Sequence, residues 1–191
     1  SNDNLWRVIR SIVNSSTAPA NAVNFSILII DNSQRATAKA VFEQAIQTYA
    51  FIDIEYLTTP QNNMGLARSM AIEHSKTEWV AFVDSDCIVG CDWLLNLLIA
   101  FRREKSKNQK LCAVGGSNCA PSDQSDFYAA VELMKKVIWG NLNSTQLKVT
   151  AGDKKDKYVD HLRTTNVLYE RQAVLNVGNF SVLNRVVGED L

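Results

Sequence analysis

Residues 78–86 read EWVAFVDSD, and this stretch decides the fold class that the sequence predicts. Its first part, residues 78–83, is a short apolar run that ends abruptly at Asp84-Ser-Asp86. Such a run, bounded by polar residues, is typical of a strand that is buried on both faces of a parallel sheet. A helical pattern of apolar side chains follows over residues 92–103. The stretch is therefore expected to be one strand-to-helix unit of an α/β fold.

The same alternation continues on both sides of this unit. Residues 25–30 form another apolar run that we expect to be a strand buried on both faces. Strands that alternate with helices indicate βαβ units and a mostly parallel sheet. A long polar loop is expected over residues 139–158. Further strands are expected over residues 51–57, 111–116 and 164–169, and helices over residues 5–13, 36–50, 65–74, 126–138 and 171–177.

Composition limits the function classes. The chain has 191 residues, 46% of them hydrophobic and 21% charged, with a formal net charge of zero. This balance favours one globular domain and argues against a nucleic-acid-binding protein, which is usually strongly basic. No apolar run approaches the roughly 18 residues of a transmembrane helix, and no signal peptide is evident. Cysteines at 87, 91, 112 and 119 match no zinc-site spacing. We expect them to be reduced thiols, which favours the cytoplasm.

Several common enzyme motifs are absent from the sequence. It contains no G-x-G-x-x-G, no G-x-x-x-x-G-K-[ST] and no G-x-S-x-G pattern. Dinucleotide-dependent oxidoreductases, P-loop nucleotidases and serine hydrolases need these turns for their chemistry. The two histidines, His74 and His161, have no metal-ligand spacing and receive no function.

Asp84 and Asp86 are the best candidates for a metal site. They follow directly on a predicted strand, and ligands of open α/β sheets bind beyond the carboxyl ends of the strands. Two carboxylates at this spacing can meet one divalent cation, and such oxygen ligands suit Mg²⁺ or Mn²⁺. Because aspartate is also common in turns, the pair alone is a weak signal.

Three further groups of polar residues have both a structural and a functional interpretation. Asp31 and Asn32 end a predicted strand, so they could cap the next helix or bond a base or ribose. Arg68 could meet a diphosphate or simply pair with Glu73. Glu189-Asp190 could start a helix or present a catalytic carboxylate.

Taken in order, these pieces resemble the inverting glycosyltransferases of family 2, which have the GT-A fold. The resemblance covers residues 27–190, almost the whole chain, and it implies a Rossmann-like, mostly parallel central sheet flanked by helices. The matching stretches are residues 27–33 (ILIIDNS), 62–68 (NNMGLAR), 79–86 (WVAFVDSD), 92–94 (DWL), 114–116 (VGG), 165–171 (TNVLYER), 178–180 (GNF) and 188–190 (GED).

The resemblance implies a role for each matching residue. Asp31 and Asn32 would lie against the base and ribose of a nucleotide sugar, and Arg68 would approach its phosphates. Many members have a second aspartate at the position of Asn32. Asp84 would face the ribose or sugar, and Asp86 together with Asp84 would bind the Mn²⁺ or Mg²⁺ that bridges the diphosphate. Gly115 and Gly116 would let the backbone pass close to the donor sugar. Asp190 would be the general base, and Glu189 would lie beside it at the acceptor site.

The same resemblance implies the partners and the setting. The donor would be a nucleotide diphosphate sugar, most often a UDP-sugar, and the acceptor a glycan or a lipid-linked molecule. Polysaccharide biosynthesis in the cytoplasm, with possible peripheral association at the inner face of the membrane, is the usual setting. Two other functions stay open: a catalytically silent glycosyltransferase-like binding domain, and a nucleotidyltransferase, although the glycine-rich basic loop of the latter is not seen.

The chain also departs from the family pattern at both ends. The first strand of the family, which lies in the middle of the sheet, would come before the helix that starts near Leu5. The helices that shape the acceptor site would come after Asp190. We therefore expect residues 1–191 to form a single glycosyltransferase domain that lacks this first strand and these C-terminal helices.

Overall fold

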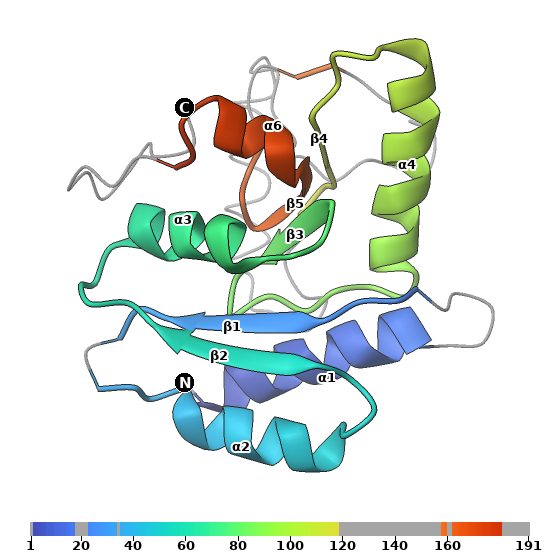
Figure 1. The fold of residues 1–191 in the computed structure, drawn as a ribbon. Coiled ribbons are helices and arrows are strands. Elements are labelled where there is room, and N and C mark those ends of the chain that lie inside the picture. Colours follow the sequence, from blue (N-terminus) through green and yellow to red (C-terminus); the bar gives the residue numbers. More distant parts are fainter. Residues whose placement is uncertain (1, 18–22, 34, 119–157, 160–161, 181–191) are drawn as a thin grey trace, which may run out of the picture.

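The computed structural model describes residues 2–17, 23–33, 35–118, 158–159 and 162–180 (Figure 1). The expected helix over residues 126–138, nearly all of the expected loop over residues 139–158, and the acidic pair Glu189-Asp190 lie outside the described residues. No helix in the described part of the chain is long and apolar enough to cross a membrane.

The helices and strands alternate as expected, with ends that differ from the predicted ones by a few residues. The elements in chain order are α1 (Asn2–Thr17), β1 (Ile27–Asp31), α2 (Lys39–Thr48), β2 (Ile54–Thr58), α3 (Met64–His74), β3 (Trp79–Val83), α4 (Trp93–Lys107), β4 (Ala113–Gly115), β5 (Asn166–Glu170) and α6 (Arg171–Asn176). The α/β class is therefore confirmed.

The described strands form two sheets. One contains β1 and β2, which run parallel with Ile27 opposite Ile54, and the other has the order β3-β5-β4. β5 is antiparallel to both of its neighbours, so β3 and β4 are parallel to each other. Among the described strands, none pairs with the second edge of β1 or of β3. The expectation that the chain lacks the family's first strand, which lies in the middle of the sheet, stays a prediction.

The first hydrophobic core lies under the two-stranded sheet. Helices α1 and α2 cover one face of this sheet, and α3 lies on the other side of β1 (Figure 1). The expectation that β1 is buried on both faces is wrong, because burial alternates along the strand. Ile27 and Ile29 point into the core, whereas Leu28 and Ile30 are only half-buried. The core consists of Ile9, Val13, Ile27, Ile29, Val41, Ala45 and Ile54.

The second core joins α4 to the three-stranded sheet. It consists of Leu94, Leu97, Phe101 and Leu168, and Trp79 and Phe25 pack against its edge. β3 is half-buried throughout, which also differs from the expected full burial. Aromatic rings pack on both of its faces: Trp79 lies near Phe101, and Phe82 contacts the rings of Tyr169 and Phe180.

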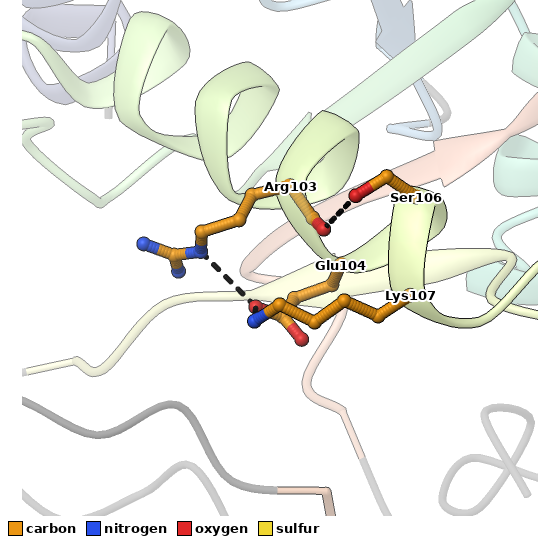
Figure 2. Close-up of polar contacts among 4 residues, drawn as sticks. All are labelled: Arg103, Glu104, Ser106 and Lys107. Atoms are coloured by element: carbon orange, nitrogen blue, oxygen red, sulfur yellow. Dashed lines mark hydrogen bonds and ion pairs between the residues drawn. The ribbon is translucent and has the colours of Figure 1, made fainter.

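Helix α4 ends in a small charged network. Glu104 accepts hydrogen bonds from Arg103 Nε at 3.0 Å and from Lys107 Nζ at 2.7 Å, as Figure 2 shows. The Ser106 hydroxyl donates to the carbonyl of Arg103 in the same turn. Basic residues in the last turn of a helix offset the partial negative charge of its C-terminus. This end of α4 is therefore stabilised locally.

A buried side chain of β5 supports the second core. Leu168 is 1% exposed, so Leu168→Ala is expected to lower the free energy of unfolding by about 2–5 kcal/mol, because it leaves a cavity. Urea unfolding followed by circular dichroism measures this change. Ile99→Ala on the exposed side of α4 is the control and should cost less than about 0.5 kcal/mol. Equal losses in the two variants would contradict the assigned core.

Candidate functional site

The carboxyl ends of β3 and β4 meet at the first residue of β5. In the antiparallel register, Val83 of β3 lies opposite Asn166, and Gly115 of β4 lies opposite Val167. The backbone N–H of Gly116 donates to the carbonyl of Asn166 at 3.1 Å. As a result, two groups of residues lie at the same end of the sheet: Asp84 and Asp86, which follow β3, and Gly115-Gly116 at the end of β4.

Asp84 and Asp86 lie in a tight turn after β3. Asp84 is half-buried and Asp86 is exposed, and the backbone N–H of Cys87 donates to the carbonyl of Asp84 at 3.1 Å. Burial raises the pKa of the Cys87 thiol to about 11, and the negative charges of Asp86 and Asp84 add to this effect. The charges of Asp84 and Asp86 beside this thiol favour the approach of a cation to the turn.

The residues present fit a hard divalent cation. Asp84 and Asp86 offer carboxylate oxygens, and Mg²⁺ and Mn²⁺ are commonly bound by one or two carboxylates together with substrate phosphates. The described residues contain no cluster of three or more histidine, cysteine, aspartate or glutamate side chains that could hold a metal by themselves. Phosphate oxygens and water would have to complete the coordination.

The cysteines do not supply such a cluster. Cys87, Cys91 and Cys112 are free thiols, and Cys119 lies outside the described residues.

Gly115 and Gly116 allow close packing at the end of β4. A Cβ atom on Gly115 would lie 2.8 Å from Cδ2 of Leu162, and one on Gly116 would lie 2.6 Å from Nδ2 of Asn166. Neither position has room for a side chain. This packing is a structural reason for both glycines, in addition to the expected approach of a donor sugar to their backbone.

Asn166 and Trp93 were missed by the sequence analysis as site residues. The indole Nε1–H of Trp93 donates to Oδ1 of Asn166 at 2.9 Å, and Nδ2 of Asn166 donates to the carbonyl of Ser117 at 3.2 Å. The stretches 92–94 and 165–171 carry these residues, and both were matched to the family without a role. The contact between Trp93 and Asn166 could not be found from the sequence, because the two residues are 73 residues apart.

Asp31 lies at the end of β1, in the other sheet, and its carboxylate is bonded within the protein. It is 6% exposed. Oδ1 accepts the backbone N–H of Ser33 at 2.8 Å, and Oδ2 accepts the N–H of Ala38 and the hydroxyl of Tyr56, each at 2.9 Å. Since Ala38 immediately precedes α2, the capping interpretation of Asp31 describes what the carboxylate does here.

The pKa values of Asp31 and Tyr56 reflect this bonding. Burial alone would raise the pKa of Asp31, but the hydrogen bonds from Ser33, Ala38 and Tyr56 outweigh burial and hold the pKa below its ordinary value of 3.8. Burial, together with the bond to Asp31 and its charge, raises the pKa of Tyr56 to about 12. The pair therefore stays a carboxylate and a neutral phenol at neutral pH. Asn32, the next residue, is half-buried.

Helix α3 carries Arg68 and is tied to the end of the described chain. Asn63 caps its N-terminus, because its Oδ1 accepts the backbone N–H of Leu66 at 2.9 Å. Arg68 is 9% exposed, and the hydroxyl of its neighbour Ser69 donates to the carbonyl of Phe180 at 2.9 Å. Nδ2 of Asn179 donates to the carbonyl of Ser69 as well. The proposed roles of Glu189 and Asp190 cannot be related to these positions, since both residues lie outside the described part of the chain.

Known proteins share sequence with this chain. Residues 1–174 match the profile of a family described as "Glycosyl transferase family 2". Among curated proteins, the chain is similar to "Succinoglycan biosynthesis protein ExoM" of Rhizobium meliloti (strain 1021), with 33% identity over 72 residues. This match covers 38% of the chain and 23% of the relative.

Two solved structures share the fold. One is a mannosyltransferase from Pyrobaculum calidifontis in complex with GDP-Man and Mn²⁺, with a TM-score of 0.62 and 12% identity. The match covers 100% of this chain and 46% of that one. The other is TarS of S. aureus, residues 1–349, with a TM-score of 0.62 and 14% identity, over 98% of this chain and 49% of that one. The chain thus spans about half the length of these structures.

The bonds at Asp31 predict how stability depends on pH. Asp31→Asn is expected to lower the free energy of unfolding by about 2 kcal/mol near neutral pH, because the amide cannot replace all the acceptors of a buried carboxylate. Because the folded-state pKa of Asp31 is lowered, its contribution is present above the unfolded pKa and is lost as pH falls through the folded value. Urea unfolding at about pH 7 and about pH 3 should therefore show a smaller difference between variant and wild type in acid.

The control for this experiment is Asp53→Asn, which changes an exposed aspartate. It should leave stability nearly unchanged at both pH values. A difference between Asp31→Asn and wild type that stays the same in acid would count against the inferred bonding.

Proposed function

Since the chain belongs to glycosyl transferase family 2, we propose that it transfers a sugar from a nucleotide diphosphate sugar to an acceptor hydroxyl. The transfer inverts the anomeric carbon and is assisted by Mn²⁺ or Mg²⁺. The observation that carries this proposal is the meeting of the Asp84-Ser-Asp86 turn with Gly115-Gly116 at the carboxyl ends of β3 and β4. The carboxylates at this end of the sheet can hold a cation for an anionic diphosphate, and the glycines beside them can leave space for a sugar.

In this proposal, Asp86 and Asp84 hold the cation and Asp84 also faces the ribose or sugar. A divalent cation bound there supplies a Lewis acid that neutralises the charge of the departing diphosphate. The turn supports this role because it places two carboxylates, one half-buried and one exposed, two residues apart directly after β3.

The nucleoside half of the donor is assigned to the end of β1 and to α3. Asp31 accepts bonds from Ser33, Ala38 and Tyr56, and a carboxylate has only about four acceptor sites. These bonds hold the loop after β1 in place, and Asp31 is proposed to lie with Asn32 against the base and ribose. The amide of Asn32 can both donate and accept there, and Arg68 is proposed to meet the phosphates.

Asp190 is proposed as the general base, with Glu189 beside it at the acceptor site. In an inverting transfer, the acceptor hydroxyl attacks the anomeric carbon on the face opposite the leaving diphosphate. The hydroxyl must lose its proton as the new bond forms, and a positioned carboxylate can accept it. One base is enough, and no covalent intermediate with the protein is needed.

The similar proteins support a proposal for the setting of the reaction. The chain resembles a succinoglycan biosynthesis protein, so we propose polysaccharide biosynthesis with a glycan or lipid-linked acceptor. The proposed donor is a UDP-sugar, although one similar structure holds GDP-Man, and both nucleotides belong in the test. The proposed location is the cytoplasm, with peripheral association at the inner face of the membrane.

The metal assignment predicts cation-dependent nucleotide binding. UDP or GDP should raise the melting temperature of the chain in the presence of Mn²⁺ and much less in its absence, because ligand binding to the native state stabilises it. Asp86→Ala should remove most of the Mn²⁺-dependent part of this shift. Calorimetric titration with and without Mn²⁺ checks the same effect as an affinity.

The control for Asp86→Ala is Asp53→Ala, which removes an exposed aspartate that follows no site strand. It should bind as the wild type does. If the wild type responds to no nucleotide with Mn²⁺, a catalytically silent domain is the better interpretation. A response to nucleoside triphosphates but not to diphosphates would favour a nucleotidyltransferase.

The assignment of the base predicts a separation of binding from catalysis. Asp190→Asn keeps the shape of the side chain but cannot accept a proton, so transfer should fall by at least about 100-fold while donor affinity stays nearly unchanged. Sugar transfer measured with a radiolabelled donor, alongside calorimetric donor binding, tests both parts. Transfer at a rate near that of the wild type would exclude Asp190 as the base.

A further inference from the structure

We propose that Asn166 is a positioning residue of the site. Its side-chain amide fixes the start of α4 and the turn over residues 115–118 at the carboxyl ends of β3 and β4. By doing so it shapes the part of the site that receives the sugar half of the donor. The assignment rests on the proposed function.

The position of Asn166 is the first reason. It is the first residue of β5 and lies opposite Val83, which immediately precedes Asp84. Its backbone carbonyl accepts the N–H of Gly116. One residue therefore links the strand end that carries the acidic turn to the strand end that carries the two glycines.

The chemistry of the amide is the second reason. Oδ1 accepts the indole N–H of Trp93 at 2.9 Å, and Nδ2 donates to the carbonyl of Ser117 at 3.2 Å. To make both bonds, a single side chain must offer one acceptor and one donor. An amide does this, whereas a carboxylate offers only acceptors and an aliphatic side chain offers neither.

The space around the amide is the third reason. A Cβ atom on Gly116 would lie 2.6 Å from Nδ2, 3.0 Å from Oδ1 and 3.1 Å from Cγ of Asn166. The amide therefore packs flat against the backbone of Gly116. Gly116 and Asn166 form one unit, in which the glycine provides the space that the amide fills.

The bond between Trp93 and Asn166 joins the start of α4 to the start of β5, and we call it the Trp93–Asn166 clamp. A second clamp joins α4 and β5 at their opposite ends. Nζ of Lys105 in α4 donates to Oε2 of Glu170, the last residue of β5, at 2.6 Å, and to the carbonyl of Leu111 at 2.8 Å. Trp79, which begins β3, lies opposite Glu170. This Lys105–Glu170 clamp joins α4 to β5 at the amino end of β3, away from the acidic turn.

The arrangement of the strands puts Asn166 near the place where the sugar half of the donor would bind. In the proposed function, the nucleoside lies at the end of β1 and the diphosphate at the end of β3. In Figure 1, β3 is drawn nearer to β1 than β4 is, and β5 lies between β3 and β4 in the sheet. A donor that extends from β1 past β3 reaches the ends of β5 and β4 with its sugar.

The experiment compares three variants of the chain. Asn166→Ala removes both amide bonds, and Trp93→Phe removes only the indole donor, so the second variant tests the clamp if the first fails to fold. Lys105→Met is the matched control, since it breaks the clamp at the other end of the same helix and strand. Affinities are measured by calorimetry for UDP and UDP-glucose, and for GDP and GDP-mannose, each with Mn²⁺.

The expected result is selective. Asn166→Ala should weaken binding of the nucleotide sugar by about tenfold, which is the size of one lost polar interaction, and binding of the diphosphate alone by less than about threefold. Trp93→Phe should change the same affinity in the same direction. Lys105→Met should leave both affinities within about twofold of the wild type even if it lowers the melting temperature as much.

A spectroscopic measurement reports the clamp itself. The indole N–H resonance of Trp93, identified in a ¹H–¹⁵N spectrum by its absence in Trp93→Phe, should move upfield in Asn166→Ala and stay in place in Lys105→Met. This confirms that the first variant is folded and has lost the bond.

Two outcomes separate failure of this assignment from failure of the proposed function. If the wild type binds nucleotide and Asn166→Ala shows either unchanged affinities or equal losses for the sugar nucleotide and the diphosphate, the positioning role is wrong and the proposed function stands. If the wild type binds none of the four ligands, the proposed function is wrong and the assignment of Asn166 falls with it.

Discussion

The antiparallel ladder between β5 and its two neighbours is the constraint on which the site depends. The strand end that carries Asp84 and the strand end that carries Gly115 meet through the first residue of β5, although β4 and β5 are separated by a long stretch of chain. Because β5 runs against both strands, its amino end lies at their carboxyl ends. A parallel β5 would instead place Glu170, its last residue, beside the acidic turn. The direction of one strand therefore decides which side chains line the site.

Most elements, but not their directions, could be predicted from the sequence. A short apolar run followed by a polar turn fixes a strand and its end locally, so the strand that ends in Val83 was predicted to the residue at its carboxyl end. The alternation of strands with helices predicts a mostly parallel sheet, which describes the pairing of β1 with β2 but not the antiparallel pairing of β5 with β3 and β4. β5 is reached only after a long connection, and so its antiparallel course could not be predicted.

The candidate site was predictable where chemistry follows from residue type and not where it follows from contact. Asp84 and Asp86 stand out in the sequence because two acids come directly after a buried strand. Asn166 does not stand out, since its importance comes from bonds to Trp93 and Ser117, which are distant in sequence. Asp31 shows the same limit: its position at a strand end is visible in the sequence, whereas the bond from the hydroxyl of Tyr56, 25 residues away, is not. Both cases turn on non-local hydrogen bonds.

The presence of two hydrophobic clusters has a consequence for how the protein can change. One cluster supports the sheet of β1 and β2, the other supports β3, β5 and β4, and the half-buried Phe25 packs against both. Substitutions that are distant and share no partner have additive effects on stability. Mutations around one sheet can therefore accumulate with little effect on the packing beneath the other. Under the proposed function, base preference and sugar preference are two traits that can diverge one at a time, with Phe25 as the position where they are coupled.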